Sequence, residues 1–514
     1  MSHNQTKLYI VLTFTVLGVV TGLSVRSAQR LAHKWSPNIP RTWDDEAMRS
    51  LEVPLANSAM SPKHISSDYY YRVPVRPIYK SYPVYHPDKE PSGYLNSLKS
   101  KQPEVVFDAA QLKSEADWIT AGELVFDAPA EFESTGLLFS GVRDRVWYEK
   151  NRVPVTKDGI LPFMRYVVRE KGKVELGFFS CAMCHTRVMP DGAVIKGAQG
   201  NFPDDRTFGS EIRIKAAQVE DKDKDKALQE LRDELHRSYA APWLRDDPNA
   251  RTNRMSAEEI ASALEAIPQG VCARQGSSIF YPTRIPDLIG VRERRFLDST
   301  GLFRQRDIAD LMRYAALNQG ADGLSSYGEF RPKGELPDPA KLNRYSDEQL
   351  YALALFIYSL KPPANPNRFD ALAARGQKVF AQEGCAGCHT PPLYTNNHLS
   401  PVDGFKVPDE HRQKYDILPV SVGTDSNLAL KSRRGTGYYK VPSLKGVWYR
   451  GPFEHNGSVA TLEDWFDSRR LSESYVPTGF RRHDVKTQAV KGHPFGLDLS
   501  QADRQALIAF LKTL

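Results

Sequence analysis

Residues 181–185 (Cys-Ala-Met-Cys-His) and residues 385–389 (Cys-Ala-Gly-Cys-His) are two copies of one pattern. Two thiols three positions apart lie on one helical turn and reach the two vinyl groups of a single porphyrin, while the adjacent histidine ligates the iron. A redox dithiol or half of a zinc site would also have two cysteines at this spacing, but two complete copies that include the histidine favour haem. The pattern predicts two covalently bound haem c groups. The predicted cofactor-binding residues are Cys181, Cys184, His185, Cys385, Cys388 and His389, with His185 and His389 as iron ligands.

The N-terminal segment indicates where the protein resides. Lys7 precedes the apolar run 8–25, and Arg26 closes it. A run of this length lies at the lower edge of what spans a bilayer, so it is either a signal-peptide core or an uncleaved anchor. The poor cleavage site at residues 25–28 slightly favours the anchor. Because haem c is attached outside the cytoplasm, we expect a periplasmic or otherwise extracytoplasmic protein, with residues 8–25 as its inner-membrane anchor if they are retained.

Composition limits the classes of partner. The chain has 514 residues, a net charge of +7, 41% hydrophobic and 25% charged residues, which is typical of a globular protein of two or three domains. The basic residues are scattered and no nucleic-acid motif is present, so we expect no nucleic-acid partner. The mildly basic surface suits an acidic redox donor, although simple solvation is the favoured explanation. The fifth cysteine, Cys272, is interpreted as a buried structural thiol.

The chain repeats itself, which supports the two-haem interpretation independently of the cysteines. Each half has a helix before the haem motif, a Pro-x-Leu-x-Gly-Val segment after it, and a closing helix with a hydroxyl residue at its cap. About 50 extra residues separate the first helix from its haem motif. The matching segments are 121–126 with 375–380, 286–291 with 442–447, and 346–360 with 500–514.

The repeat predicts a mainly α fold of two tandem cytochrome c-like helical domains. An irregular Pro/Tyr-rich extension precedes them, and the charged stretch 217–259 is expected to form a solvated helical insertion. The predicted units are 1–26 (signal peptide or membrane anchor), 27–115 (extension), 116–362 (first cytochrome c domain) and 366–514 (second cytochrome c domain).

The histidines beyond the haem motifs predict two unlike haems. Three of them, His455, His483 and His493, lie beyond the second motif near its middle turn and closing helix, whereas the equivalent residues 286–346 contain none. We therefore expect a six-coordinate second haem suited to electron transfer and a first haem open on its far side. His493 is the favoured ligand. His455, which aligns with Asp298 across the repeat, is the next choice.

Two alternatives qualify this asymmetry. His483 is the third choice for the second haem, although its surroundings are typical of a surface residue. The first haem has three conceivable ligands of its own: His236 in the insertion, the nearby Met189, and Met312, for which core packing is the simpler role. Recruitment of any of them would close the first haem as well.

The two haem motifs, the two Pro-x-Leu-x-Gly-Val segments and residues 451–462 (Gly-Pro-Phe-Glu-His-Asn-Gly-Ser-Val-Ala-Thr-Leu) resemble the di-haem cytochrome c peroxidase superfamily. This superfamily includes bacterial cytochrome c peroxidases, the methylamine dehydrogenase maturation enzyme and rubber oxygenases. In the peroxidases, the resemblance implies, the N-terminal haem reduces hydrogen peroxide. The C-terminal haem receives electrons from a small redox donor protein.

The chain departs from the peroxidase pattern. Leu297 stands where peroxidases place a tryptophan, and their acid–base glutamate segment has no counterpart after Tyr314. The long spacing between the haem motifs looks more like that of the rubber oxygenases. Those enzymes hold dioxygen in an apolar pocket. In this chain Phe296 and Phe303 are candidates for such a pocket, although core packing is the simpler role for both. A haem dioxygenase and an electron-transfer cytochrome without a substrate therefore remain alternatives to the peroxidase-like enzyme.

Three arginines precede the turn of the first half and are candidate sources of positive charge near the first haem: Arg292, Arg294 and Arg295.

Overall fold

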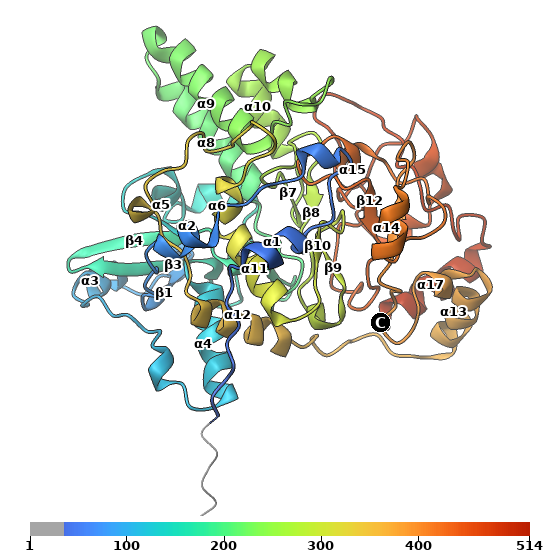
Figure 1. Cartoon of the computed structure of the whole chain (residues 1–514), viewed down its shortest axis with the longest axis horizontal. Helices are drawn as coiled ribbons and strands as arrows, with labels where there is room; N and C mark the ends of the chain where they lie inside the picture. Colours follow the sequence, from blue (N-terminus) through green and yellow to red (C-terminus); the bar gives the residue numbers. More distant parts are fainter. Residues whose placement is uncertain (1–34) are drawn as a thin grey trace, which may run out of the picture.

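Two equivalent helix pairs frame the two halves of the protein. The computed structural model describes residues 35–514. Helix α4 (Glu115–Asp127) packs against α12 (Asp347–Ser359), and α13 (Ala371–Gln382) packs against α17 (Gln501–Lys512) (Figure 1). In each pair, the helix that precedes a haem motif contacts the helix that closes the same half. The repeated first and closing helices expected from the sequence are therefore present.

Each helix pair crosses at a glycine. A β-carbon on Gly122 would overlap the carbonyl oxygen of Ala352, and one on Gly376 would overlap the carbonyl oxygen of Ala506. Only glycine allows the two backbones to approach so closely, so each crossing fixes the residue type. The two crossings are equivalent in the repeat, which shows that the halves share packing as well as motif order.

A four-stranded antiparallel sheet combines three strands of the insertion before the first haem motif with one strand of the N-terminal extension. The strands β1 (Ser81–Tyr85), β2 (Glu131–Glu133), β3 (Ile160–Glu170) and β4 (Lys173–Phe178) follow the order β1-β3-β4-β2. Strand β3 is buried along most of its length, because its run of apolar residues faces covered surface on both sides. Helix makes up 39% and strand 12% of residues 35–514, so the expectation of a mainly α fold is wrong and the fold is mixed.

The N-terminal extension is part of the core rather than irregular chain. It forms helices α1 (Asp45–Leu51), α2 (Ser67–Arg72) and α3 (Tyr94–Lys99) in addition to β1. Trp43 is fully buried, and its indole Nε1 donates to the carbonyl oxygen of Ile65 at 2.9 Å. Apolar and aromatic side chains of the extension thus supply one wall of the largest hydrophobic cluster, which also contains residues of α4, α11 and α12.

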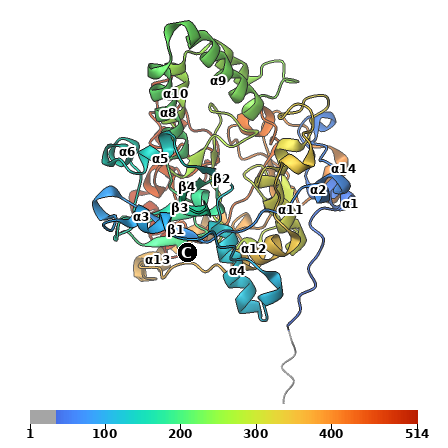
Figure 2. The ribbon, with the colours of Figure 1, turned by 90° about the vertical axis from the view of Figure 1, so that its left-hand side faces the viewer.

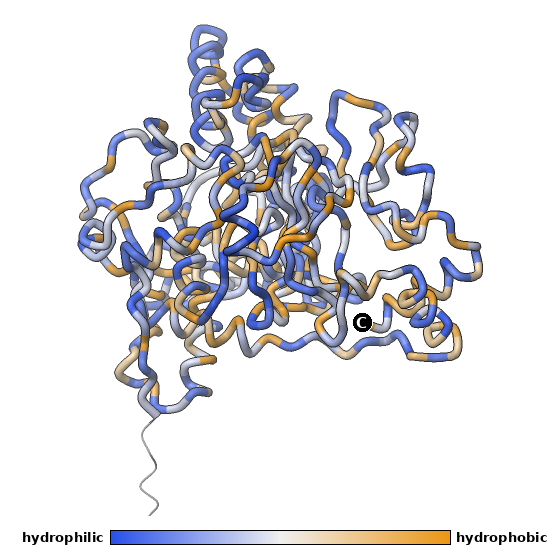
Figure 3. The backbone as a smooth tube through the Cα atoms, turned by 45° about the vertical axis from the view of Figure 1, so that its right-hand side comes forward, coloured by the Kyte–Doolittle hydropathy of each residue, from blue (hydrophilic) through white to orange (hydrophobic). Residues whose placement is uncertain are grey.

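The remaining elements are short, except for the long helices of the insertion after the first haem motif. In Figure 1 and Figure 2 the helices α8, α9 and α10 project from the body, and Figure 3 shows that much of their chain is hydrophilic, as expected of a solvated insertion.

The other helices are α5 (Leu137–Gly141), α6 (Arg145–Asn151), α7 (Cys181–Cys184), α8 (Asp204–Gln218), α9 (Lys224–Tyr239), α10 (Ala257–Glu265), α11 (Ile308–Asn318), α14 (Asp409–Lys414), α15 (Asn427–Leu430) and α16 (Leu462–Trp465). The paired short strands are β5 (Thr186–Val188) with β6 (Val194–Lys196), β7 (Val271–Cys272) with β8 (Thr283–Arg284), β9 (Phe296–Leu297) with β10 (Phe303–Arg304), and β11 (Leu399–Pro401) with β12 (Tyr438–Lys440).

The expected membrane segment cannot be placed in this fold. Within residues 35–514, every helix is too short or too polar to cross a bilayer. The apolar run 8–25 lies outside the described residues.

Candidate haem-binding sites

Each haem motif forms a single helical turn. The first motif is helix α7, which begins after Ser180, and the His185 amide donates to the carbonyl oxygen of Cys181 at 2.9 Å. The second is a 3₁₀ turn over Cys385–Gly387, and the His389 amide donates to the Cys385 carbonyl oxygen at 2.8 Å. One turn holds both thiols of a motif close to its histidine, which is the arrangement that c-type attachment requires.

Backbone carbonyls orient both motif histidines. Nδ1 of His185 lies 3.0 Å from the carbonyl oxygen of Pro286, and Nδ1 of His389 lies 3.1 Å from that of Tyr394. Burial lowers the pKa of each imidazole to about 4, so both are neutral. A neutral imidazole that donates from Nδ1 has its lone pair on Nε2, the form that binds a metal.

His493 faces His389 across the second site. The two ring centroids are 6.3 Å apart. Two imidazoles on opposite sides of one metal ion, at about 2 Å per bond, place their ring centres about 6 Å apart. Nδ1 of His493 is buried and has no hydrogen-bond partner among the described residues. The separation fits a haem iron between the two rings.

The loop that carries His493 is held from several sides. The residue has a left-handed φ of +48°, and its amide donates to the carbonyl oxygen of Val422 at 2.7 Å. The guanidinium of Arg470, only 1% exposed, donates to the carbonyl oxygens of Val490, Gly492 and His493. These contacts fix the direction of the imidazole despite the unfavourable backbone angle.

The other two candidate histidines are engaged elsewhere. Nδ1 of His455 lies 2.9 Å from the Glu454 carboxylate, and Nε2 lies 3.8 Å from Asp425. His455 therefore has carboxylates at both ring nitrogens, which suits an orienting role rather than an iron ligand. His483 is half-buried beside Asp484, a carboxylate paired with Arg251.

The backbone also changes the repeat alignment at this turn. Asp298 and Glu454 both have left-handed φ values, +69° and +70°. Both carboxylates are nearly buried. Asp298 is therefore the equivalent of Glu454, and the expected match of His455 with Asp298 is off by one residue. Each half has one buried carboxylate in this tight turn.

The first haem motif has no facing histidine in the part of the chain that the structure describes. His236 packs edge-on against Phe330, at 5.9 Å between ring centroids. Met189 packs in a small apolar cluster, and Met312 is fully buried in the largest one. The sequence-based alternatives for the first haem thus have packing roles, whereas the second site has His493. Among the described residues, the histidines around the two motifs therefore differ.

A buried charge network lies beside the first motif. Arg274 donates to Asp298 Oδ1 at 2.9 Å and to the Tyr314 hydroxyl at 3.3 Å, and Arg434 donates to Asp298 Oδ2 at 2.8 Å. Burial lowers the pKa of His185, and the positive charge of Arg274 lowers it further. The guanidinium of Arg274 is therefore close enough to act on the first motif. The sequence pattern did not identify this residue, because it lies far from every motif.

Sequence comparisons agree with this site. The family described as RoxA-like, cytochrome c-like matches residues 437–476, the segment that contains Pro442 and His455. The methylamine utilization protein MauG of Methylorubrum extorquens is 29% identical over 143 residues, which are 28% of this chain and 34% of that protein. The cytochrome-c peroxidase IdrP1 of Pseudomonas sp. (strain SCT) is 28% identical over 167 residues, 29% of this chain and 41% of that protein. The matches thus span between one third and about two fifths of these relatives.

Two solved structures are also similar. A MauG-like protein associated with microbial copper homeostasis has a TM-score of 0.29 and 16% identity, covering 56% of this chain and 88% of that one. The hydrazine synthase of Kuenenia stuttgartiensis has a TM-score of 0.28 and 15% identity, covering 55% and 86%. The sequence matches confirm the resemblance to the di-haem cytochrome c peroxidase-like superfamily and support c-type haem as the cofactor.

Proposed function

We propose that the chain is an extracytoplasmic di-haem redox enzyme that reduces hydrogen peroxide at its N-terminal haem. The first haem is held by Cys181, Cys184 and His185, and the second by Cys385, Cys388 and His389. Electrons enter at the second haem from a small redox donor protein. The observation that carries the proposal is the inequality of the two sites, because a closed haem suits electron transfer and an open one suits a reacting ligand.

The chain's residues define the roles of the two sites. Haem supplies one-electron redox chemistry and, where a coordination position is open, a place for peroxide to react. The carbonyls of Pro286 and Tyr394 keep the two imidazoles in the tautomer that can bind iron. His493 closes the far side of the second site, and Arg470 keeps its loop in place.

Positive charge near the first site suits the negative charge that develops on oxygen before protonation yields water. Reduction of peroxide needs protons and develops negative charge on oxygen, so a fixed cation nearby is favourable. Arg274 is such a cation, held by Asp298 and Tyr314. Of the three arginines noted in the sequence, Arg295 pairs with Asp416 at the surface and Arg292 stacks over the Tyr358 ring.

A haem dioxygenase is the second candidate, because the matching family model is described as RoxA-like. The two phenylalanines considered for its apolar pocket are both in the core. Phe296 packs with Val53 and Leu399, and Phe303 stacks edge-on against Tyr314 at 4.7 Å. Their positions support packing roles, so the peroxidase-like proposal is preferred.

The decisive experiment mixes hydrogen peroxide with the fully reduced protein and follows the absorption of both haems. We expect rapid reoxidation of both haems, because the first site reacts and the second supplies an electron. Reoxidation no faster than in buffer alone would instead indicate an electron-transfer cytochrome. A stable dioxygen complex in the purified protein would favour the dioxygenase. Mass spectrometry of the mature protein should first show the added mass of two porphyrins.

A further inference from the structure

Four basic side chains occupy equivalent places in the two halves. Arg284 precedes Pro286 by two residues, and Lys440 precedes Pro442 by two. Arg294 and Arg450 each follow the corresponding proline by eight residues. Each Pro-x-Leu-x-Gly-Val segment is therefore flanked by the same pair of positive charges.

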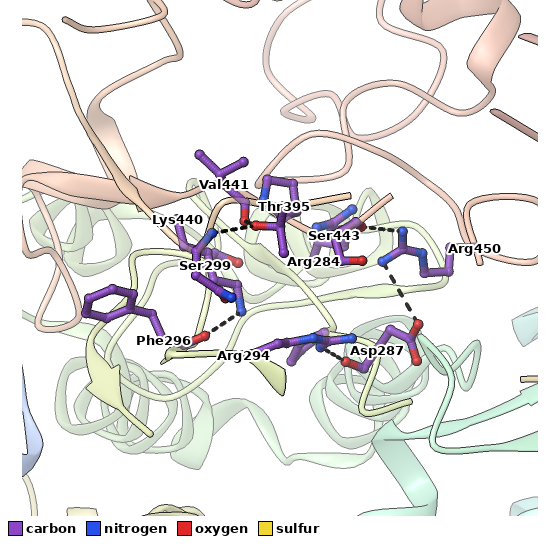
Figure 4. Close-up of a pocket in the computed structure, with 13 residues that line it drawn as sticks. Arg284, Asp287, Arg294, Phe296, Ser299, Thr395, Lys440, Val441, Ser443 and Arg450 are labelled. Carbon is purple, nitrogen blue, oxygen red and sulfur yellow. Dashed lines mark hydrogen bonds and ion pairs between the residues drawn. The ribbon is translucent and has the colours of Figure 1, made fainter. Parts of the chain in front are cut away.

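All four side chains line one cavity between the two haem motifs (Figure 4). Pro286, whose carbonyl oxygen contacts His185, is part of its wall. Thr395 is also part of the wall, and it directly follows Tyr394, the residue whose carbonyl oxygen contacts His389. The cavity thus lies next to the backbone that orients both motif histidines.

The cavity is small. Its volume of about 30 Å³ has room for about two water-sized groups. A separate organic substrate would not fit, whereas one carboxylate oxygen reaching in from each of two groups would. The size therefore favours a small anionic group over a second substrate site.

The positive charge in the cavity exceeds what the protein neutralises. Asp287 is the one carboxylate in the lining, and it lies 3.9 Å from Arg450 and accepts from the Tyr449 hydroxyl at 3.1 Å. Lys440 has only the Phe296 carbonyl oxygen, at 3.4 Å, among the described residues. The guanidinium of Arg284 makes no hydrogen bond or ion pair within residues 35–514. The carboxylates of Asp298 and Glu454 lie outside the lining but raise the pKa of Lys440 and of Arg284, respectively, so the positive charge of the lining is only partly balanced.

The basic side chains of the cavity lie close together and away from solvent, which lowers the pKa of two of them. Burial and the neighbouring Arg294 lower the pKa of Lys440 to about 7. Burial and the neighbouring Arg450 lower the pKa of Arg284 to about 10. Buried cations are stable when paired with anions, so this cluster needs a partner that the polypeptide does not supply.

We propose that the cavity binds carboxylates, namely a propionate group from each of the two porphyrins. The inference rests on the proposed di-haem function, since haem carries two propionates and the chain offers one equivalent basic pair to each site. A cluster shared between both propionates links the two redox centres electrostatically. A positive charge near a haem stabilises its reduced form, so removal of one shared charge lowers both midpoint potentials.

Arg284 is the best position for the test because its guanidinium has no protein partner to lose. We would measure the midpoint potentials of both haems in the holoprotein by optical redox titration for wild type, Arg284→Gln and Arg284→Lys. We expect Arg284→Gln to lower both potentials and Arg284→Lys, which retains the charge, to restore them. Arg295→Gln is the matched control, since Arg295 is 64% exposed and pairs with Asp416, and it should leave both potentials unchanged.

The outcomes separate this inference from the proposed function. If Arg284→Gln carries two haems but moves neither potential, or moves only one, the shared carboxylate site is wrong. If the wild-type potentials change with added phosphate, the cavity holds an exchangeable free anion and the proposal is also overturned. Should Arg284→Gln fail to fold, Lys440→Met provides the same comparison. Absence of porphyrin from the wild type would instead refute the di-haem function itself.

Discussion

The imidazoles of His389 and His493 face each other at 6.3 Å between ring centroids, although they belong to distant parts of the second half. His389 is fixed by a haem-type turn, whereas His493 lies on a loop with a left-handed backbone angle. Such an angle costs about 1 kcal/mol or more, and it persists only where the surroundings impose it. Arg470 is the residue that imposes it, because its guanidinium binds three carbonyl oxygens of that loop.

Replacing His493 should open the second haem. In His493→Gln the ring that faces His389 is lost, so we expect half of the haem to change from low spin to high spin. The absorption spectrum of the oxidised protein measures this change, with haem content checked separately. His483→Gln is the control, because His483 lies beside Asp484 and away from the paired rings. An unchanged low-spin spectrum in His493→Gln would show that another residue is the ligand.

The glycine at the second helix crossing should be intolerant of any side chain. In Gly376→Ala the new methyl group overlaps the carbonyl oxygen of Ala506, so α13 and α17 must separate. We expect a loss of about 1–3 kcal/mol in the free energy of unfolding, despite the better helix propensity of alanine. Gln377→Ala is the control, since Gln377 is the next residue of α13 and its side chain is exposed. Equal denaturation midpoints for the two variants would contradict the crossing.

The repeat made the helical frame predictable from the sequence. Gly122 and Gly376 occupy matching positions before the two haem motifs, and the structure places both at helix crossings. The sheet was not predicted, because the apolar run of β3 is buried on both faces and lacks the alternation that marks a half-exposed strand. Its partner β1 comes from the extension, a long-range pairing that local patterns do not reveal.

The candidate site could be predicted only where the spacing of residues in the sequence indicates their chemistry. The haem motifs and the preference for His493 came from the sequence, since few histidines lie near the middle turn and closing helix of the second half. The charge network was missed, because Arg274, Asp298 and Arg434 meet only in the folded chain. The basic pairs around the two Pro-x-Leu-x-Gly-Val segments were visible as a repeat, but their convergence on one cavity was not.

Asp298 should be a large contributor to stability. Burial alone would raise its pKa, but Arg274 and Arg434 hold the pKa of this carboxyl well below the ordinary 3.8. Its stabilisation is therefore complete above pH 3.8 and is lost as the pH falls further. Asp298→Asn removes the carboxylate that Arg274 and Arg434 share, while Arg434 keeps Asp322 at 3.6 Å, and we expect a loss of about 3 kcal/mol in the free energy of unfolding.

Chemical denaturation at neutral pH measures the Asp298 effect. The matched control is Asp416→Asn, which removes the partner of Arg295 at the surface. An exposed ion pair contributes about 0–1 kcal/mol, so that variant should be close to wild type. If the two variants are equally stable, the buried network does not hold the turn.

Glu211 on α8 should make stability fall as the pH rises. Burial raises the pKa of this carboxyl from 4.5 to about 7, although Lys215 lies 3.9 Å away. The folded protein therefore holds a proton that the unfolded chain releases, so the stabilising contribution is complete below pH 4.5 and is lost as the pH rises through 7. Because Glu211 is partly exposed, we expect the free energy of unfolding to fall by about 1–2 kcal/mol over this range.

The variant Glu211→Gln tests this expectation. Its side chain is neutral at every pH, so its melting temperature should decline less between pH 4.5 and 8 than that of wild type. Glu230→Gln, on the exposed surface of α9, should follow wild type, and parallel curves for all three proteins would rule out a proton held at Glu211.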